Sequence, residues 1–470
     1  MLKTLKSNLP FLVLAVFISF TAYFNSLSGE FVSADDEPGI VNNSSLTSDS
    51  ILLHKNIQQT INSVIVKTFG IKPAPFHVLS LTLQLINIIL VFALTKELIS
   101  TRISAITTLL FALHPINTEA VTWISASGYL LRNIFLFSTA YLFTRYIKEK
   151  NIKFYIGSVS VYLLGLFTTK DPWILTTLPI LGIIDYFFLS AKHPRMQINA
   201  VYKYLPFITS TFIFILIIIF PQYRNRVEVL SIDTQSVTPV INRAPYILFK
   251  TAELLIMPIN LTIYHDNSQI SYGDYQWMVA ISLIWLLIVL RYWQKNRTVT
   301  GLLFGIPLTL LPSFSPVIIA WFIAERYLYT ATWLFSIGVA MLLLKLNKSV
   351  FAAVLTIILI LYWVRVVDRN RDFADNIALW EATQKTNPVS YRVYNNLGDA
   401  YLRAGDTQKA VASFQHAIEI NPQYSDAIYN LGRLYVDLGQ TEEARLLLNR
   451  SLEINPNLVP ATELLEKIGR

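Results

Sequence analysis

The sequence contains no cysteine, and only 14% of its 470 residues are charged. Without cysteine the chain has no disulfide, no thiol nucleophile and no thiolate ligand for a metal ion. An average soluble domain carries about 25% charged residues, so the low charge argues against a soluble globular protein. The sequence also has no glycine-rich phosphate loop after a strand, and we expect no soluble α/β domain that binds a nucleotide sugar.

Long apolar runs are abundant instead, and 53% of the residues are hydrophobic. Runs near 20 residues recur, and each can cross about 30 Å of hydrocarbon. The segment 246–263 contains Lys250 and Glu253, so we interpret it as an interfacial or re-entrant helix. The sequence therefore predicts an all-α, polytopic membrane protein with about eleven spans, at residues 8–27, 77–97, 101–114, 129–146, 153–169, 173–190, 203–221, 276–292, 299–312, 327–345 and 350–367.

The positive charge of the chain, formally +8, follows the turns between these spans. Clusters of Lys and Arg in short loops are typical of the cytoplasmic side, so the charge indicates topology and not binding of nucleic acid. The first residues resemble a signal peptide, but the long apolar run favours a retained span with Lys3 and Lys6 in the cytoplasm. Eleven spans then place the C-terminus outside.

The last hundred residues repeat with a period of 34, since Asn387-Pro388 recurs as Asn421-Pro422 and Asn455-Pro456. This period, with Gly398 recurring as Gly432, is the tetratricopeptide pattern, in which each repeat is a pair of antiparallel helices. We expect two full repeats, with a half repeat before them and a capping helix after them. Such arrays bind extended peptides or proteins in a concave groove, and a packing spacer is the alternative.

The chain is thus divided into a membrane domain, 1–370, and a repeat domain, 371–470. Just past the first span lie two adjacent carboxylates, Asp35 and Asp36. In an extended segment adjacent side chains point to opposite faces, so we expect different roles. One would act as a general base toward a substrate hydroxyl, and the other would hold the loop or a cation. A solvated acidic loop is the alternative.

Other polar residues interrupt the apolar sequence, where ionisable groups are costly and mark functional candidates. His77, Gln84 and Asn87 lie on one face of the second span, and we expect this stripe to face the bundle interior. His114 and Glu119 lie in the loop FALHPINTEAVTWISASGYLLRN. The alternatives are interhelical hydrogen bonds for the stripe and a capping or core role for His114.

Three cations on the same predicted side are candidates for binding a phosphate: Arg132, Lys170 and Arg326. Arg326 is favoured because it stays charged and can bind bidentately. Consecutive helix positions do not face each other, so Glu325 and Arg326 should have separate partners, and Arg132 is one candidate for Glu325. Asp171, which precedes a proline, is interpreted as a helix N-cap.

These motifs together resemble a known family. FVSADDEPGIVNN, FALHPINTEAVTWISASGYLLRN, TTKDPW with LGIIDY, and AERYLYTAT match, in order, the membrane protein O-mannosyltransferases that carry tetratricopeptide repeats, a family of the GT-C class. The resemblance covers nearly the whole chain. It implies active-site loops on the external face and transfer of a sugar, typically mannose, from a polyprenyl phosphate to an acceptor hydroxyl.

By this resemblance the base is Asp35 first and Asp36 second, while His114, Glu119 and the triplet Glu325-Arg326-Tyr327 occupy motif positions without fixed roles. The chain departs from the family pattern at Gln84 in LTLQLIN, and at Lys-Asp-Pro, where Lys-Glu is more usual.

We therefore expect an inverting glycosyltransferase whose partners are a polyprenyl-phosphate sugar, an acceptor protein in the repeat groove and membrane lipids. No cofactor is predicted, and a divalent metal is left open. We expect a bacterial cytoplasmic membrane with a periplasmic active face. The alternatives are a membrane-anchored scaffold that recruits envelope proteins, or a ligase or transporter of lipid-linked oligosaccharide.

Overall fold

A computed structural model describes residues 2–47, 56–189, 201–222, 240–265, 271–293, 295–314 and 322–469. Across these residues the chain forms helices and turns, without a β-strand. It divides into two compact units, the first of Met1–Gly29 and Asp35–Arg371, the second of Glu30–Ala34 and Asp372–Arg470. The second unit therefore includes a short segment that the sequence had assigned to the membrane domain.

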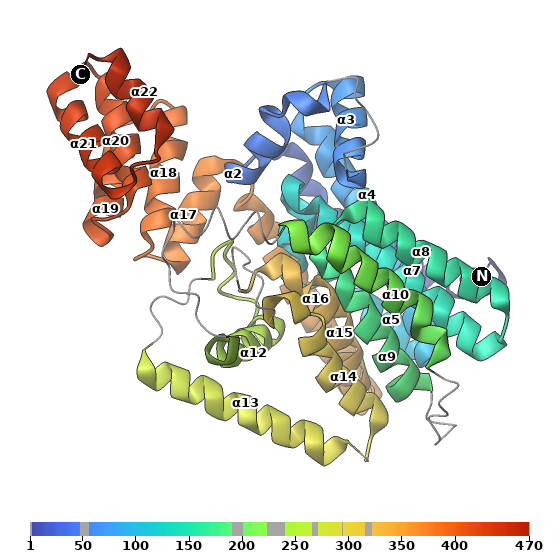
Figure 1. Ribbon diagram of the computed structural model, residues 1–470. Helices are drawn as coiled ribbons and strands as arrows, with labels where there is room; N and C mark the ends of the chain where they lie inside the picture. Colours follow the sequence, from blue (N-terminus) through green and yellow to red (C-terminus); the bar gives the residue numbers. More distant parts are fainter. Residues whose placement is uncertain are drawn as a thin grey trace. The chain divides into compact units, whose positions relative to one another are not determined.

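The first unit is a bundle of helices (Figure 1). Its longer helices are α1 (Leu2–Tyr23), α4 (Pro73–Leu98), α7 (Ser127–Glu149), α8 (Ile152–Thr169), α13 (Tyr272–Tyr292), α15 (Tyr329–Leu343) and α16 (Lys348–Arg371). Shorter ones are α3 (Ile57–Phe69), α5 (Thr101–Leu113), α6 (Asn117–Thr122), α9 (Thr177–Ile183), α10 (Leu205–Phe214), α12 (Val240–Ile256) and α14 (Arg297–Leu308). A helical turn, α2 (Ser33–Asp36), carries the two adjacent aspartates.

Among the described residues, eight helical runs are long and apolar enough to cross a membrane. They are Leu9–Ser28, Pro73–Leu98, Ile152–Thr169, Pro172–Leu189, Tyr202–Gln222, Tyr272–Tyr292, Glu325–Leu343 and Lys348–Arg371. The helices α5 and α14 are apolar but shorter. Each predicted span coincides with helix, while the count of eleven stays a prediction. Segment 246–263 is helical only up to Ile256, and its interfacial placement also stays a prediction.

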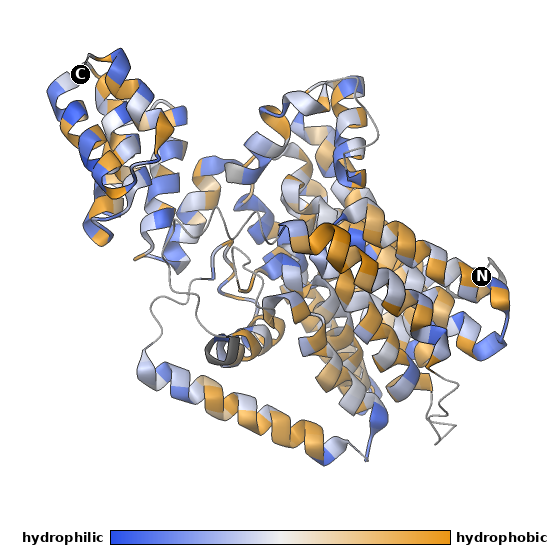
Figure 2. Cartoon of the chain, viewed as in Figure 1, coloured by the Kyte–Doolittle hydropathy of each residue, from blue (hydrophilic) through white to orange (hydrophobic). Residues whose placement is uncertain are grey.

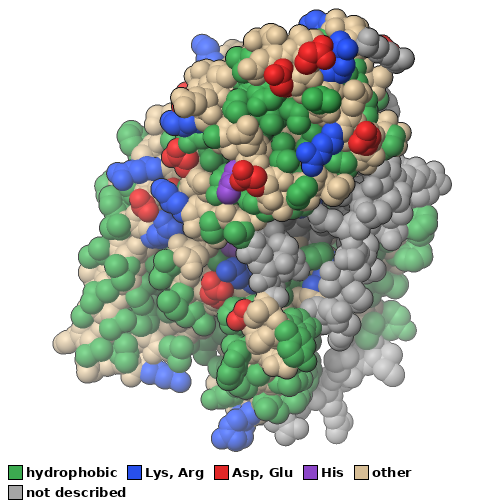
Figure 3. Space-filling model, turned by 90° about the vertical axis from the view of Figure 1, so that its left-hand side faces the viewer, with side chains coloured by type: hydrophobic (Ala, Val, Ile, Leu, Met, Phe, Trp, Pro, Cys, Tyr) green, Lys and Arg blue, Asp and Glu red, His purple; other side chains and the backbone are tan. Residues whose placement is uncertain are grey.

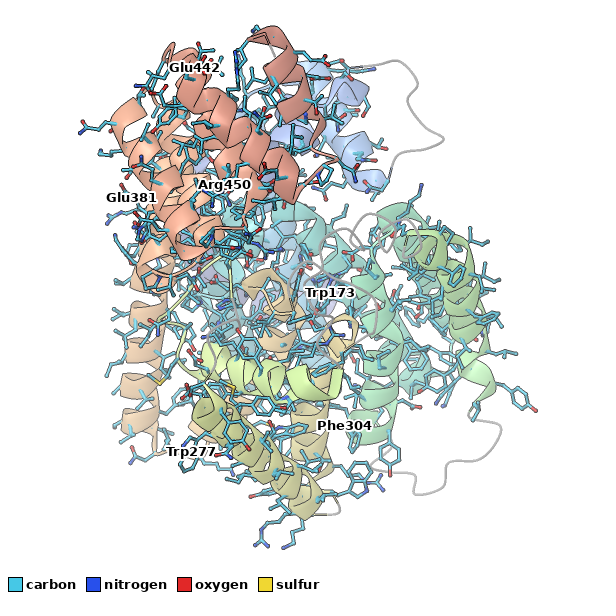
Figure 4. The ribbon with its side chains drawn as sticks, turned by 60° about the vertical axis from the view of Figure 1, so that its left-hand side comes forward. Trp173, Trp277, Phe304, Glu381, Glu442 and Arg450 are labelled. Carbon is cyan, nitrogen blue, oxygen red and sulfur yellow. The ribbon has the colours of Figure 1, made fainter. Side chains whose placement is uncertain are left out.

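Several of these helices expose apolar side chains on their outer faces. The most apolar part of α16 has a mean hydropathy of 2.5, yet only 6% of it is buried within the protein, and α13 is 11% buried. Trp277 of α13 is 72% exposed (Figure 4). Figure 2 shows the middle of α13 as largely hydrophobic. Contiguous apolar surfaces of this size are rare on soluble monomers, so the unit is an integral membrane domain.

The bundle interior is closely packed. A Cβ on Gly165 of α8 would come within 3.0 Å of the Phe135 Cβ of α7, so the glycine lets these two helices approach. Trp333 of α15 is fully buried and donates from Nε1 to the Thr95 hydroxyl of α4 at 2.8 Å. Buried polar groups in membrane helices are commonly paired across helices in this way.

The second unit confirms the 34-residue repeat. It comprises α17 (Asn376–Thr386), α18 (Tyr391–Arg403), α19 (Thr407–Ile420), α20 (Ser425–Asp437), α21 (Thr441–Ile454) and α22 (Val459–Lys467). Gly398 of α18 allows the close helix pairing, because a Cβ there would lie 2.7 Å from the ring of Phe414 on α19. Figure 3 shows acidic and basic side chains of the repeat helices interspersed with hydrophobic and uncharged ones.

Candidate active site

The two adjacent aspartates have different environments. Asp36 is fully buried, and its Oδ1 accepts hydrogen bonds from the Ser125 backbone N–H at 2.9 Å and from the Ser125 hydroxyl. Asp35 is exposed. The extended conformation expected from the sequence is wrong, because the pair lies in the helical turn α2. About 100° per residue on a helix still separates the two side chains.

Ser125 connects the acidic turn to a polar cavity of about 510 Å³. Helix α7 begins beside this cavity and α8 ends there, so it lies at one end of the helices. Gln58, Ser125, Lys170, Asp171 and Gln222 contribute to its lining from separate parts of the chain. Its size falls in the range of small-molecule sites, about 300–1,000 Å³.

Lys170 and Asp171 reach the cavity through the turn between α8 and the next helical segment. Lys170 ends α8 in the left-handed region, with φ 52°. Asp171 accepts from the Trp173 N–H at 2.9 Å, which confirms the predicted N-cap. Its other oxygen lies 3.5 Å from the guanidinium of Arg132, which is buried. Lys170 is thus presented to the cavity by the turn that also holds Arg132.

Arg132 lies among aromatic rings. Its guanidinium carbon is 4.7 Å from the centre of the Tyr129 ring and 5.8 Å from that of Trp173. Trp173 in turn stacks on Tyr327 at 4.2 Å, and Figure 4 shows Trp173 inside the bundle. A cation over an aromatic face keeps its charge in a site from which water is largely removed. Its contact with Asp171, at 3.5 Å, is long for a hydrogen bond.

Arg326 is paired much more closely. Its guanidinium donates to Glu119 Oε1, and its backbone N–H donates to Oε2 at 2.8 Å. Both side chains are buried, and the guanidinium also lies 5.0 Å from the centre of the Trp123 ring. Burial raises the pKa of the Glu119 carboxyl, and the Arg326 charge opposes that rise. The charge of Arg326 is therefore compensated inside the protein.

Glu325 has a different partner, as expected for consecutive positions. Arg369 of α16 lies 3.2 Å from its carboxylate, and His265 Nε2 lies 3.7 Å away. The Thr262 backbone N–H also donates to this carboxylate. The proposed pairing of Glu325 with Arg132 is wrong, since Arg132 lies against Asp171 instead.

The polar stripe of α4 faces the bundle interior, as the sequence predicted. His77, Gln84 and Asn87 are all buried. His77 Nε2 lies 3.2 Å from the Gly29 carbonyl, and Asn87 donates to the Leu130 carbonyl at 2.9 Å. Gln84 accepts from the Tyr329 hydroxyl of α15. The stripe thus forms hydrogen bonds to other segments of the bundle, which was the alternative interpretation given from the sequence.

His114 is also a packing residue. Its Nε2 lies 3.1 Å from the Leu255 carbonyl, and its ring packs on Phe335 and Tyr362, with centroids 5.7 and 5.0 Å away. This is the core role that the sequence left open.

Three residues with important contacts were not singled out from the sequence. Ser125 was present in the quoted loop but had no predicted partner. Gln58 lay in a segment interpreted only as an external loop. Arg369 lay just beyond the predicted span 350–367. A cation next to an apolar run is usually interpreted as an interfacial anchor, so no partner was expected for it. In the described parts of the chain, no group of three or more His, Asp or Glu side chains is arranged to hold a metal ion.

Comparison with known proteins agrees with this architecture. Two tetratricopeptide-repeat family models match residues 401–468 and 363–425. The chain is 25% identical to protein O-mannosyl-transferase TMTC3 of Homo sapiens, over 88% of this chain and 52% of that protein. It is 26% identical to protein O-mannosyl-transferase F38B6.6 of Caenorhabditis elegans, over 88% of this chain and 63% of that protein.

The fold and these matches first define the class, a membrane protein with a tetratricopeptide domain. The resemblance seen in the sequence is also confirmed, because the chain matches tetratricopeptide-repeat models and is similar over most of its length to proteins named protein O-mannosyl-transferase. The chain spans about half to two thirds of the length of these two relatives.

Proposed function

We propose that the protein is a membrane glycosyltransferase that moves a sugar, mannose by analogy with its relatives, from a polyprenyl phosphate to a Ser or Thr hydroxyl of an acceptor protein. The observation that carries the proposal is the polar cavity joined through Ser125 to the acidic turn, in a chain similar to proteins named O-mannosyl-transferase. The cavity offers a cation for a phosphate and polar side chains for a sugar.

The different surroundings of the two aspartates support a division of roles. The exposed Asp35 can meet an incoming hydroxyl, whereas Asp36 is occupied by its bonds to Ser125. Asp35 takes the proton from the acceptor hydroxyl as that oxygen attacks the anomeric carbon. The bond from this carbon to the phosphate oxygen breaks, and the lipid phosphate leaves with the electron pair. A single displacement inverts the configuration of the sugar.

The cations differ in how well they suit the departing phosphate. Lys170 lines the cavity, and Arg132 contacts Asp171 of the same lining at the long distance of 3.5 Å. Arg326 is engaged by both carboxylate oxygens of Glu119. We therefore assign the donor phosphate to Lys170, with support from Arg132, and give Arg326 a structural role. Positive charge there stabilises the negative charge that develops on the leaving phosphate.

The remaining parts of the proposal concern location and acceptor. The active end of the bundle faces away from the cytoplasm, since the predicted Lys and Arg clusters lie at the other end. The repeat domain binds an extended segment of the acceptor protein in its concave groove. The donor tail lies in the surrounding lipid.

The test is transfer of label from a radiolabelled polyprenyl-phosphate sugar to a Ser- and Thr-containing peptide by the purified protein. Asp35→Asn should reduce transfer by at least about a hundredfold, the usual minimum for removing a general base, without changing the thermal unfolding temperature. Asp368→Asn is the matched control, because Asp368 is an exposed carboxylate that pairs with Arg365 at 2.9 Å, away from the acidic turn. Full transfer by folded Asp35→Asn would show that Asp35 is not the base. If the unaltered protein transfers no sugar, the scaffold alternative is favoured.

A further inference from the structure

The acidic turn α2 belongs to both units of the protein. Its first two residues, Ser33 and Ala34, are part of the repeat unit. Asp35 and Asp36 follow directly in the chain and are part of the membrane unit. On the membrane side the turn is held by the bonds from Ser125 to Asp36. On the other side it continues into a short segment of the repeat unit, so Asp35 lies between one attachment to each unit.

This short segment, Glu30–Ala34, is anchored within the repeat unit. The Glu30 backbone N–H donates to the Ala374 carbonyl at 2.9 Å, just before α17 begins. Val32 is 2% exposed, and Phe373, the neighbour of Ala374, is 1% exposed. A backbone hydrogen bond and burial of an apolar side chain both hold a segment in place. The residues that lead into the acidic turn are therefore fixed by contacts far away in the sequence.

The membrane unit holds the chain where it leaves for the repeat unit, after Gly29 and after Arg371. His77 Nε2 lies 3.2 Å from the Gly29 carbonyl. Asn370 is buried and accepts a hydrogen bond from the Thr122 hydroxyl at 2.7 Å. The chain is thus fixed at both points, and the course of the segment that enters the acidic turn depends on its contacts in the repeat unit.

We propose that residues 30–34 position the base Asp35, so that the repeat domain is a working part of the transfer site and not only a platform for the acceptor. This rests on the proposed function, in which Asp35 is the base. Asp35 is exposed, so its position depends on the backbone that carries it. A misplacement of about 1 Å can cost about a hundredfold in rate. A base attached to the domain that holds the acceptor keeps the two reacting groups in one frame.

The test uses Glu30→Pro in the full-length protein. Proline has no backbone N–H, so the bond to Ala374 is lost. Gly29 already has the extended backbone that suits the position before a proline, with φ −67° and ψ 156°. The kcat for transfer from polyprenyl-phosphate mannose to a Ser- and Thr-containing peptide should fall about two- to tenfold, the range expected for one hydrogen bond. The KM for the peptide and the binding of the donor should not change.

Glu30→Ala is the matched control, because it removes the exposed carboxylate and keeps the N–H bond. Transfer by this variant should equal that of the unaltered protein. Val32→Ala is the second test variant, since it shortens the buried side chain of the same segment and keeps the test open if Glu30→Pro does not fold. It should lower kcat with the same unchanged KM.

A positioning residue acts through the base, so its effect should depend on Asp35. In the Asp35→Asn background, neither Glu30→Pro nor Val32→Ala should lower the residual transfer further. A general loss of structure would instead lower transfer by the same factor in both backgrounds.

An unchanged kcat in both folded variants would overturn the inference and leave the proposed function standing. An equal fall in Glu30→Ala, or a fall that persists in full in the Asp35→Asn background, would also overturn it. Weaker donor binding in the variants would do the same, because the change would then reach the donor site. If the unaltered protein transfers no sugar, the proposed function and the inference fail together.

Discussion

Arg132 and Arg326 are both buried arginines near the same aromatic cluster, yet their surroundings differ in one decisive respect. Arg326 is held by both oxygens of Glu119, with the backbone N–H donating at 2.8 Å. Arg132 makes one long contact of 3.5 Å with Asp171, and its Nε has no partner within the described residues. Burial of a charge therefore does not mark a binding site by itself. What distinguishes a candidate site is hydrogen-bonding capacity that the protein leaves unused beside a cavity.

The largest expected effect is on the buried ion pair of Glu119 and Arg326. Glu119→Gln leaves the Arg326 charge buried and uncompensated, so we expect the free energy of unfolding to fall by about 3–5 kcal/mol. Thermal unfolding in detergent measures the change. Glu97→Gln is the control, because Glu97 pairs with Lys148 at the surface and its removal should cost at most about 1 kcal/mol. Equal effects of the two changes would contradict a structural role for the Glu119–Arg326 pair.

This comparison also shows how far the sequence could lead. Apolar length located the helices, and the period of 34 residues located the repeats, because both signals are local. Asp before Pro172 identified the N-cap at Asp171 for the same reason. The partners of Glu119 and Glu325 are 207 and 44 residues away, so they depend on the tertiary arrangement. The side chain of Gln58 meets the hydroxyl of Ser127, which is 69 residues away in the sequence, so no local pattern predicts this contact.

Lys170→Asn tests the other half of the comparison, the cations beside the cavity. Asparagine tolerates the left-handed backbone at this position, so the variant removes charge with little strain. We expect binding of polyprenyl phosphate to weaken about 10- to 100-fold, which corresponds to a charge-assisted hydrogen bond of about 1.5–3 kcal/mol. The control is Lys72→Asn, which removes an exposed lysine before α4. Unchanged binding by Lys170→Asn would transfer the phosphate to another site.

The smallest effect is expected for Ser125→Ala, which keeps the backbone N–H bond to Asp36 and removes the hydroxyl bond. Stability should fall by about 1 kcal/mol, and transfer should fall several-fold because the acidic turn is held less firmly. Ser158→Ala is matched for stability, since its buried hydroxyl donates to the Thr139 carbonyl within the bundle. If Ser158→Ala also loses transfer, the loss follows from removing any buried hydroxyl of the bundle and not from loosening the acidic turn.

The most direct test of the donor site uses a photoreactive polyprenyl-phosphate mannose and mass spectrometry of the labelled chain. The account predicts that the label appears on the segments that line the cavity, 56–58, 125–131 and 169–172, and that unlabelled donor competes for it. Labelling of these segments should be weaker in Lys170→Asn than in the unaltered protein. Label found around Arg326 and Glu119 instead, or spread over the bundle without competition, would contradict the assignment of the donor to this cavity.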